Sequence, residues 1–332
     1  MRWFLFLLLT VVCFAEDGPG WYGDTRELYY GIPVTVRFTP ADPALATRVW
    51  AVLEAIDGDF NDYRDSSTIG RINAGGPGVY DLNPSMIEAF ALADHLRTAT
   101  HGACEITVGP LRRLWKGAAK SGIWPTADQI TATRAAIGPT TYRREGSRLS
   151  VLVPGVSFDF GGVCKGMAVD RAVALVRAAG CPAALIQVGG ETACWGIAPA
   201  QRPHRLAIPH PDHPDDPDDP WARLQDPGTG MGGSTSGNYR LPVIVQGKTL
   251  YHVYDPRTGE PADTRVLSFS VVLPGTGRNG EADGLTKAGI LLGTEGLALV
   301  QAAGGEALLL ERAADGRITE HHTSGWKRFL AP

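Results

Sequence analysis

The stretch 157–171 combines charge, glycine and a helix start. It reads S-F-D-F-G-G-V-C-K-G-M-A-V-D-R. We expect a strand to end at 158–160 and a helix to begin near Met167. Because a helix N-terminus presents free N–H groups and positive potential, the turn between them suits a phosphate group. Asp159 and Lys165 add one charge of each sign to this turn.

Three glycines shape the same turn. Gly161, Gly162 and Gly166 allow the backbone to turn tightly and to approach a ligand closely. Their spacing matches neither G-x-x-x-x-G-K-[ST] nor G-x-G-x-x-G, so neither a P-loop nor a Rossmann motif is indicated. The residues predict an anion-binding turn. An ordinary turn between strand and helix, with glycines that serve packing, is the alternative.

Three further polar clusters lie where the chain is expected to turn. They are Ser234-Thr235-Ser236, His252 with Asp255, and Asp283 with Thr286 and Lys287. Singly, each has a structural explanation: S-T-S-G and D-P-R-T-G are common turn sequences, a lone histidine is more often a satisfied buried side chain, and an aspartate often caps a helix. Together they indicate a site for a phosphorylated ligand, with a metal-binding carboxylate and one histidine that titrates near neutrality.

The elements that must position these residues follow one another irregularly. Helices are expected at 43–60, 84–100, 126–137, 168–179, 281–293 and 295–303, and strands at 29–38, 158–160, 184–188, 192–197, 205–208, 250–254, 266–273 and 307–311. The segments 192–197 and 205–208 are expected to pair with each other. Since no regular β–α–β alternation is visible, the pattern favours an α+β fold with mixed sheets and flanking helices over a doubly wound fold.

Composition excludes some classes of protein. The chain has 332 residues, of which 44% are hydrophobic and 20% are charged, as in an ordinary globular protein. The net charge is −4 and no long basic run occurs. We therefore expect no nucleic acid among its partners.

The N-terminus has the features of a secretory signal peptide. Residues 1–15 begin with a charged Arg2, continue with a short apolar run and end in small residues before Glu16. The run is too short to span a bilayer. We predict export, with residues 16–332 forming a single domain. A lipid-anchored Cys13 is the alternative, although Val12 precedes it where a lipid-attachment sequence prefers Gly or Ala.

Neither the remaining cysteines nor the low-complexity segment indicates a dedicated metal site. No C-x-x-C pair occurs, and buried free thiols are the expected state of Cys104, Cys164, Cys181 and Cys194. The segment 209–220 is rich in proline and aspartate and is expected to be a solvated loop. Its prolines are expected to hold His210 and His213 apart.

In chain order, these motifs resemble those of the ApbE family of FAD:protein FMN transferases. The family pattern D-[LF]-G-G-[IV]-A-K-G-[YF]-A-V-D is similar to 159–170, T-S-G-x-Y to 235–239, and H-x-x-D-P-x-T-G-x-P to 252–261. Weaker family motifs are similar to 61–73, 104–115, 189–191 and 282–293. The resemblance extends from about Tyr30 to Leu310.

The resemblance implies a two-lobed α+β fold with a T-fold-like core and a flavin cleft. It implies that FAD is the substrate and that Mg²⁺ binds its pyrophosphate. FMN would then be transferred to a Ser or Thr hydroxyl of an acceptor flavoprotein, a subunit of a membrane electron-transport complex, with release of AMP. It further implies an exported enzyme on the periplasmic side of the membrane, often membrane-anchored.

The resemblance also implies roles for individual residues. The FAD-binding residues would be Tyr30, Tyr63, Ala103, Cys104, Glu105, Asp159, Lys165, Ser236 and Tyr254. His252 would lie beside the reacting phosphate, where it or a nearby carboxylate takes the proton from the acceptor hydroxyl. The metal would be held by the Gly162 carbonyl and Asp283, with Thr286 and Lys287 on the same helix.

One departure from the family pattern concerns the metal. The family's metal-binding Thr lies four residues after the helix Asp, and Lys287 stands at that position. Thr286 lies one residue earlier, about 100° around the helix. An ammonium group at this place would occupy the position of the cation or repel it. Two other readings therefore remain open: an FAD-binding protein that transfers nothing, and an FAD pyrophosphatase that yields FMN and AMP.

Two further departures lengthen acidic side chains. Glu191 and Glu105 stand where the family has Asp. Each replacement keeps the charge and adds one methylene group.

Overall fold

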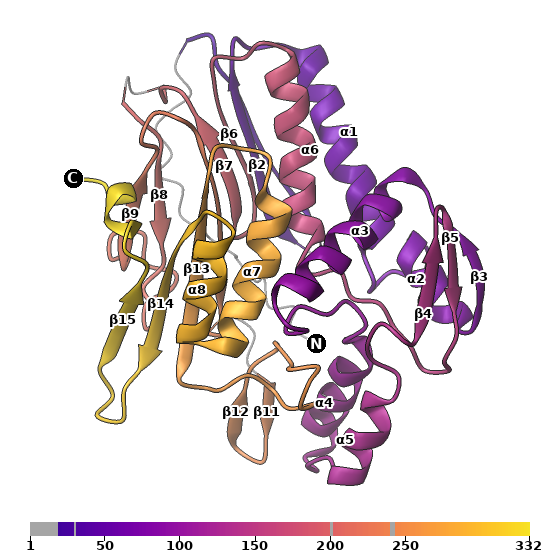
Figure 1. The fold of residues 1–332 in the computed structure, drawn as a ribbon. Helices are drawn as coiled ribbons and strands as arrows, with labels where there is room; N and C mark the ends of the chain where they lie inside the picture. Colours follow the sequence, from indigo (N-terminus) through magenta and orange to yellow (C-terminus); the bar gives the residue numbers. More distant parts are fainter. Residues whose placement is uncertain (1–18, 30, 200–201, 240–242) are drawn as a thin grey trace, which may run out of the picture.

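The computed structural model describes residues 19–29, 31–199, 202–239 and 243–332. Its largest element is an eight-stranded sheet with the order β1-β2-β6-β7-β10-β13-β14-β15 (Figure 1). The strands are β1 (Tyr22–Leu28), β2 (Ile32–Thr39), β6 (Ala183–Val188), β7 (Glu191–Trp195), β10 (Met231–Gly237), β13 (Val266–Pro274), β14 (Glu306–Arg312) and β15 (Ile318–His322). Every neighbouring pair is antiparallel, so the α+β prediction is confirmed but this sheet is not mixed in strand direction.

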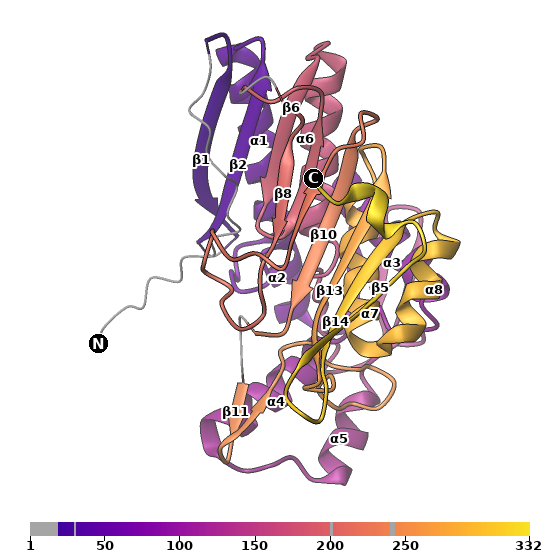
Figure 2. The same cartoon turned by 90° about the vertical axis from the view of Figure 1, so that its left-hand side faces the viewer.

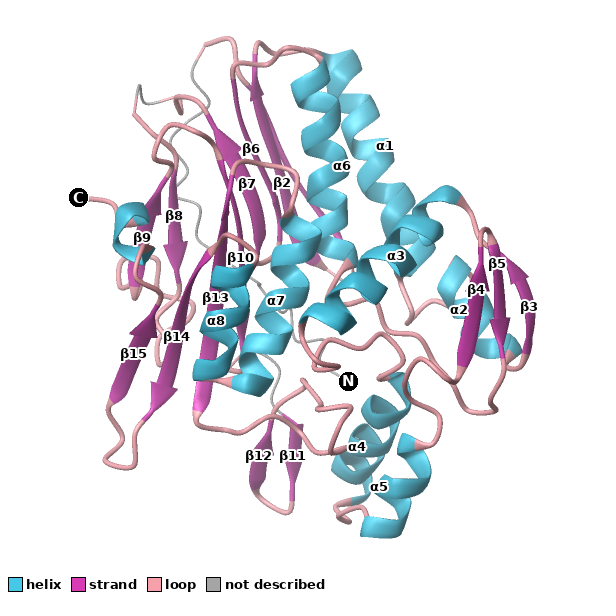
Figure 3. Cartoon of the chain, in the orientation of Figure 1, coloured by secondary structure: helices cyan, strands magenta, loops and turns pink. Residues whose placement is uncertain are grey.

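Helices cover one face of the large sheet, as Figures 1 and 3 show. The four that lie along it are α1 (Pro43–Phe60), α6 (Cys164–Ala178), α7 (Asn279–Leu292) and α8 (Thr294–Ala302). The other helices are α2 (Thr68–Gly75), α3 (Pro84–Ala99), α4 (Gly109–Ser121), α5 (Ala127–Arg134) and the 3₁₀ turn η1 (Trp326–Phe329). The long segment between β2 and β6 contains α1 to α6, although the two strands are neighbours in the sheet.

Three small antiparallel sheets complete the fold. They are β3 (Gly78–Asp81), β5 (Arg148–Val151) and β4 (Tyr142–Glu145); β8 (Arg205–Ile208) with β9 (Ala222–Gln225); and β11 (Val243–Val245) with β12 (Lys248–Leu250). In Figure 2, β8 lies on the face of the large sheet opposite the helices. The sheet is therefore covered on both faces and separates two apolar clusters.

Local signals explain where the helices begin. In α1, Pro43 occupies the first turn and the Asp42 carboxylate accepts hydrogen bonds from the N–H groups of Ala44 (2.9 Å) and Leu45 (3.1 Å). In α3, the Asn83 side chain accepts from the Met86 N–H at 2.9 Å. Both helices agree with the sequence prediction to within one residue.

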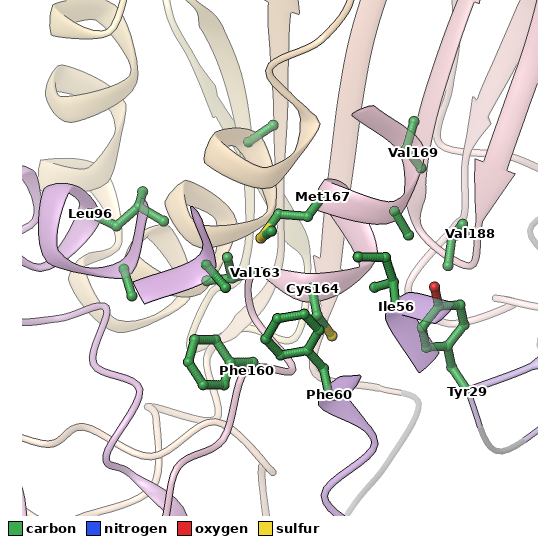
Figure 4. Packing of buried hydrophobic residues seen from close by; sticks show 14 of the residues in the cluster. Tyr29, Ile56, Phe60, Leu96, Phe160, Val163, Cys164, Met167, Val169 and Val188 are labelled. Carbon is green, nitrogen blue, oxygen red and sulfur yellow. The ribbon is translucent and has the colours of Figure 1, made fainter. Parts of the chain in front are cut away.

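Aromatic packing fixes the turn that precedes α6. The rings of Phe60 and Phe160 lie with centroids 5.1 Å apart, and Cys164 and Met167 are buried next to them (Figure 4). Because Phe60 ends α1, this contact holds the end of that helix against the start of α6. All four cysteines of the described chain are free and buried, which confirms the prediction for them.

The expected strand at 158–160 does not form. Instead, the Asn73 side chain occupies the hydrogen-bonding groups of Phe158: its amide oxygen accepts from the Phe158 N–H at 2.7 Å, and its amide nitrogen donates to the Phe158 carbonyl at 2.9 Å. The Asp159 N–H donates to the Ile106 carbonyl at 2.6 Å. The segment is thus held by side chain and loop contacts, and α6 begins at Cys164, three residues before the predicted Met167.

Two other strand predictions are wrong. The segments 192–197 and 205–208 do not pair, because β7 lies between β6 and β10, and β8 pairs with β9 instead. The segment 250–254 forms a strand only up to Leu250, where β12 ends. In contrast, the polar run 231–237, which carries Ser234 and Ser236, is the central strand β10 and not a turn.

The predicted signal peptide, residues 1–15, lies outside the described residues. Within the described part of the chain, no helix has the length and hydrophobicity needed to cross a membrane.

Candidate functional site

Asp283 lies at the centre of the site, fully buried in the second turn of α7. The Lys287 ammonium donates to its Oδ1 at 2.9 Å, and the Lys165 ammonium donates to its Oδ2 at 3.3 Å. Burial raises the pKa of Asp283, but the two ammonium groups outweigh burial and hold this pKa below its usual range. Asp283 is therefore an ionised carboxylate clamped between two lysines.

Ser236 and Thr286 complete the surroundings of Lys287. The Lys287 ammonium also donates to Ser236 Oγ at 2.6 Å. The hydroxyl groups of Ser236 and Thr286 are 2.6 Å apart, and Thr286 Oγ1 donates to the Asp283 carbonyl at 2.7 Å. The structure thus brings together Lys165, Ser236, Asp283, Thr286 and Lys287, all of which the sequence had selected.

Glu191 is a second buried carboxylate in the same cluster. Its Oε1 lies 3.6 Å from the Lys165 ammonium and accepts from Ser234 Oγ at 3.3 Å, while Oε2 has no hydrogen-bond partner within the described residues. Burial, followed by the charge of Asp283, raises the pKa of Glu191 to about 7. The sequence places Glu191 in a family-like G-G-E motif but does not predict it as a site residue. Its position after two glycines, at the start of a strand, is the sequence signal that could have identified it.

The N-terminus of α6 lies beside this cluster. Val163 at the N-cap makes no side-chain hydrogen bond to the helix, the Cys164 N–H donates to the Phe160 carbonyl at 2.9 Å, and the Lys165 ammonium donates to the Gly161 carbonyl at 2.6 Å. Free N–H groups at the start of a helix of this length bind anions well. Anion binding at this turn therefore stays a prediction.

Two of the three glycines serve close packing within the protein. A Cβ on Gly166 would lie 2.1 Å from the carbonyl oxygen of Asn279, the first residue of α7. A Cβ on Gly162 would lie 2.9 Å from Cγ of Lys287. The alternative interpretation of these glycines as packing residues is thus correct for both positions.

Asp159 belongs to a separate ion network. Its Oδ1 accepts from the Gly161 N–H at 2.9 Å, and its Oδ2 lies 3.0 Å from Arg112. Arg112 also donates to Asp62. Burial and the charge of Asp159 raise the pKa of Asp62 to about 6, although Arg112 opposes this. Asp62 and Arg112 were not selected from the sequence, because each lies in a separate segment with nothing to indicate that they meet.

His252 lies within the field of both lysines. Burial first, and then the charges of Lys287 and Lys165, lower the pKa of His252 to about 4. Its Nδ1 is buried without a hydrogen-bond partner in the described chain. The imidazole is therefore neutral at physiological pH, and its pKa lies below the near-neutral value that the sequence predicts.

Two tyrosines lie next to the Asp159 network. Tyr254 is buried, and burial raises its pKa to about 12. Tyr63 is 57% exposed, and its ring lies under Arg112 and Lys116 at 4.8 and 4.6 Å. The Tyr63 ring is thus largely exposed and lies against two cations.

The loop 103–105 is buried, with Ala103 at 3%, Cys104 at 6% and Glu105 at 9% exposure. Burial, then Asp283 and Glu105, raise the pKa of Cys104 to about 12, which places this thiol in the field of the central carboxylate. Glu105 turns inward and accepts from the Thr107 N–H and hydroxyl, both at 2.9 Å. The remaining predicted site residue, Tyr30, lies outside the described residues.

The proline-rich segment 209–220 is a largely exposed loop, as predicted, but its two histidines are not held apart. The ligand atoms of His210, His213 and Asp219 lie within 4.8 Å of one another. A turn in which the His213 N–H donates to the His210 carbonyl brings the two rings together, with centroids 5.0 Å apart. The three side chains are partly or largely exposed, and the group lies outside the cluster around Asp283.

A family model described as the ApbE family matches residues 30–309 of this chain. The chain belongs to the ApbE family. An FAD:protein FMN transferase from Vibrio cholerae is 28% identical over 314 residues, which cover 93% of this chain and 92% of that protein. One from Klebsiella pneumoniae is 31% identical over 280 residues, which cover 82% of this chain and 78% of that protein.

Solved ApbE structures share the fold. The flavin transferase ApbE from Vibrio cholerae superposes with a TM-score of 0.78 at 26% identity, covering 93% of this chain and 99% of that one. The apo form of a flavinyl transferase ApbE from Pseudomonas stutzeri superposes with the same TM-score and identity. This alignment covers 93% of this chain and 96% of the Pseudomonas chain. An ApbE protein from Thermotoga maritima, at 21% identity and a TM-score of 0.80, supports the fold alone.

The site residues do not fit the magnesium ion that the ApbE resemblance implies. Mg²⁺ requires near-octahedral oxygen ligands at about 2.0–2.1 Å. Both oxygens of Asp283 are instead bound by ammonium groups, and the Thr286 hydroxyl is bound to the Asp283 carbonyl and to Ser236. Lys287, at the position of the family's Thr, brings a positive charge to the place where the ion would lie.

Proposed function

We propose that this protein transfers FMN from FAD to a hydroxyl group of an acceptor flavoprotein and releases AMP. Family membership and the name of its relatives support the reaction. The observation that carries the proposal is His252, which is neutral, has an Nδ1 without a hydrogen-bond partner in the described chain, and lies in the field of the Lys165 and Lys287 ammonium groups. This arrangement combines a base with a site for phosphate.

In the proposed reaction, the acceptor oxygen attacks the phosphorus on the riboflavin side of the pyrophosphate. The bond from this phosphorus to the bridging oxygen breaks, and AMP leaves with that oxygen and its negative charge. His252 accepts the proton of the attacking hydroxyl. The start of α6 and the ammonium groups balance the charge on the pyrophosphate.

We propose that Tyr63 and Tyr254 lie along the ring systems of FAD and that Asp159 and Ser236 orient the site. The Tyr63 side chain is 57% exposed and aromatic. Asp159 fixes the Gly161 N–H, and Ser236 fixes the Lys287 ammonium. Magnesium is not part of this scheme, because both Asp283 oxygens bind lysines.

The test is incubation of the purified protein with FAD and an acceptor domain, followed by in-gel flavin fluorescence and measurement of AMP. We expect a fluorescent acceptor band and an equal amount of AMP. Free FMN and AMP without a fluorescent acceptor would indicate a pyrophosphatase. Tight FAD binding with neither product would indicate an FAD-binding protein that transfers nothing.

A pair of histidine variants sharpens the test. His252→Gln is expected to slow transfer about 10²–10⁴-fold while FAD still binds, because only the base is removed. His321→Gln is the matched control: this exposed histidine lies on β15, at the edge of the large sheet. Transfer at the full rate by His252→Gln would contradict the assignment of the base.

We also propose that the protein is exported to the periplasmic side of the membrane and that its acceptor belongs to a membrane electron-transport complex. The signal-like residues 1–15 support export. Mass spectrometry of the mature N-terminus is expected to show Glu16 as the first residue. A lipid-modified Cys13 would indicate an anchored form, and a cytoplasmic protein that starts at Met1 would contradict the proposal.

A further inference from the structure

The ammonium group of Lys287 lies 2.9 Å from Asp283 Oδ1, and Lys287 stands where the ApbE family pattern has a metal-binding Thr. We propose that it is the built-in cation of the pyrophosphate site, so that this protein binds FAD without a divalent metal. This inference rests on the proposed function. It concerns how the site balances the negative charge of its ligand.

Lys287 is positioned as a bound cation would be. Its Nζ lies 2.9 Å from Asp283 Oδ1 and 2.6 Å from Ser236 Oγ. An ammonium group has three N–H donors. The two contacts engage two of these donors, and the third is available to an oxygen of the ligand.

The aliphatic part of the Lys287 side chain is also fixed in position. Asp283 and Lys287 are four residues apart on α7, and this spacing places them on the same face of the helix. Cγ of Lys287 lies so close to Gly162 that a Cβ there would be 2.9 Å away. The side chain therefore crosses from α7 to the turn before α6.

The same contacts disfavour a divalent ion. A metal at Asp283 would need the carboxylate oxygens that Lys287 and Lys165 bind. It would also lie within a few ångströms of two positive charges in a buried site, where like charges repel strongly. The hydroxyl group of Thr286 is held by Ser236 and by the Asp283 carbonyl.

The first experiment measures FAD affinity by flavin fluorescence, in EDTA and in MgCl₂. The unmodified protein is expected to bind FAD equally in both. Lys287→Thr is expected to bind about tenfold more weakly in EDTA, because a charge-assisted contact is lost, and to recover in MgCl₂. Lys327→Thr, an exposed lysine on η1, is the control and should behave like the unmodified protein.

The second experiment needs no FAD. Mn²⁺ binding is followed by electron paramagnetic resonance, with Mn²⁺ as a probe for Mg²⁺. Two proteins are compared, one with Lys287 and one with Lys287→Thr. Both also carry His213→Ala, so that the His210, His213 and Asp219 group does not bind the Mn²⁺ probe. We expect no ordered Mn²⁺ with Lys287 present and one bound ion in Lys287→Thr.

The outcomes separate this inference from the proposed function. Loss of FAD binding by the unmodified protein in EDTA, or one ordered Mn²⁺ in both proteins, would overturn the role of Lys287. Absence of transfer together with metal-independent FAD binding would overturn the transferase function and leave this inference in place. If Lys287→Thr fails to fold, the two measurements on proteins that retain Lys287 still decide.

Discussion

At the residue scale, the site contains more buried charge than its sequence motifs reveal. Asp283 and Glu191 are almost fully buried, and Lys165 lies between them at 3.3 and 3.6 Å. Burial, and then the charge of Asp283, raise the pKa of Glu191 to about 7, although the shared Lys165 opposes this shift.

Glu191 is therefore expected to make stability depend on pH. A carboxyl group whose pKa is raised in the folded state stabilises the protein at low pH, and this contribution is lost as pH rises from about 4.5 to about 7. Glu191→Gln removes that titration. We expect the free energy of unfolding of this variant, measured by urea denaturation, to rise relative to that of the unmodified protein by about 2 kcal/mol between pH 5 and pH 8. A constant difference between the two proteins across this range would contradict the prediction.

His252 is expected to stay neutral well below neutral pH. Its pKa of about 4 reflects burial and the two lysines, so protonation begins only as pH falls below about 5. The histidine NMR signal that disappears in His252→Gln should keep the shift of a neutral ring from pH 8 to pH 5.5. A titration midpoint between pH 6 and pH 7 would show that the ring is solvated and not held as described.

At the element scale, α6 and α7 position both lysines, and a glycine sets the distance between the helices. Asp170 of α6 accepts hydrogen bonds from the N–H groups of Asn279 and Gly280 at 2.8 and 2.9 Å and so caps α7. Gly166 allows the start of α7 to lie against α6. Any change in this contact also displaces Asp283 and Lys287.

Gly166→Ala is expected to lower the free energy of unfolding by about 2–3 kcal/mol, because its Cβ would meet backbone atoms that cannot yield without moving α7. Gly117→Ala on α4 is the matched control: its Cβ would meet nothing within 4 Å, and it should stabilise by about 0.5–1 kcal/mol. Chemical denaturation of both variants measures the difference. Equal effects would mean that the contact between α6 and α7 adapts to a methyl group.

Periodicity and capping made α1 and α3 predictable, whereas strand pairing was not predictable. Helix α1 follows from Pro43 and a repeating apolar face, which are local signals. Strand β10 carries small and polar residues, among them Gly232, Gly233 and Ser234, because α7 packs closely on it. In the sequence, such a run of small and polar residues looks like a turn. The pairing of β8 with β9 depends on residues that no local rule connects.

The candidate site shows the same contrast. Motifs found Asp159, Lys165, His252 and Asp283, since each has a characteristic local spacing. They did not find which oxygen meets which ammonium group, because those contacts depend on how α7 is placed against α6.

At the scale of the whole molecule, Arg112 joins parts that are distant in the sequence. It lies in the first turn of α4 and binds Asp62, which follows α1, and Asp159, which precedes α6. A cation at a helix N-terminus opposes the helix dipole, so the two carboxylates must compensate for its position. They hold α4 and its separate apolar cluster against the rest of the structure.

Arg112→Met is expected to lower the free energy of unfolding by about 2–4 kcal/mol, since it leaves two poorly solvated carboxylates without their partner. The loss should be greater at pH 8 than at pH 5: the pKa of Asp62, about 6 with Arg112 present, rises further without it, and a raised carboxyl pKa costs stability as pH increases. Arg317→Met, which removes the exposed contact with Asp315, is the control and should change little. If urea denaturation shows the same loss for Arg112→Met at both pH values, packing of the arginine stem, and not its charge, connects α4 to the sheet and its helices.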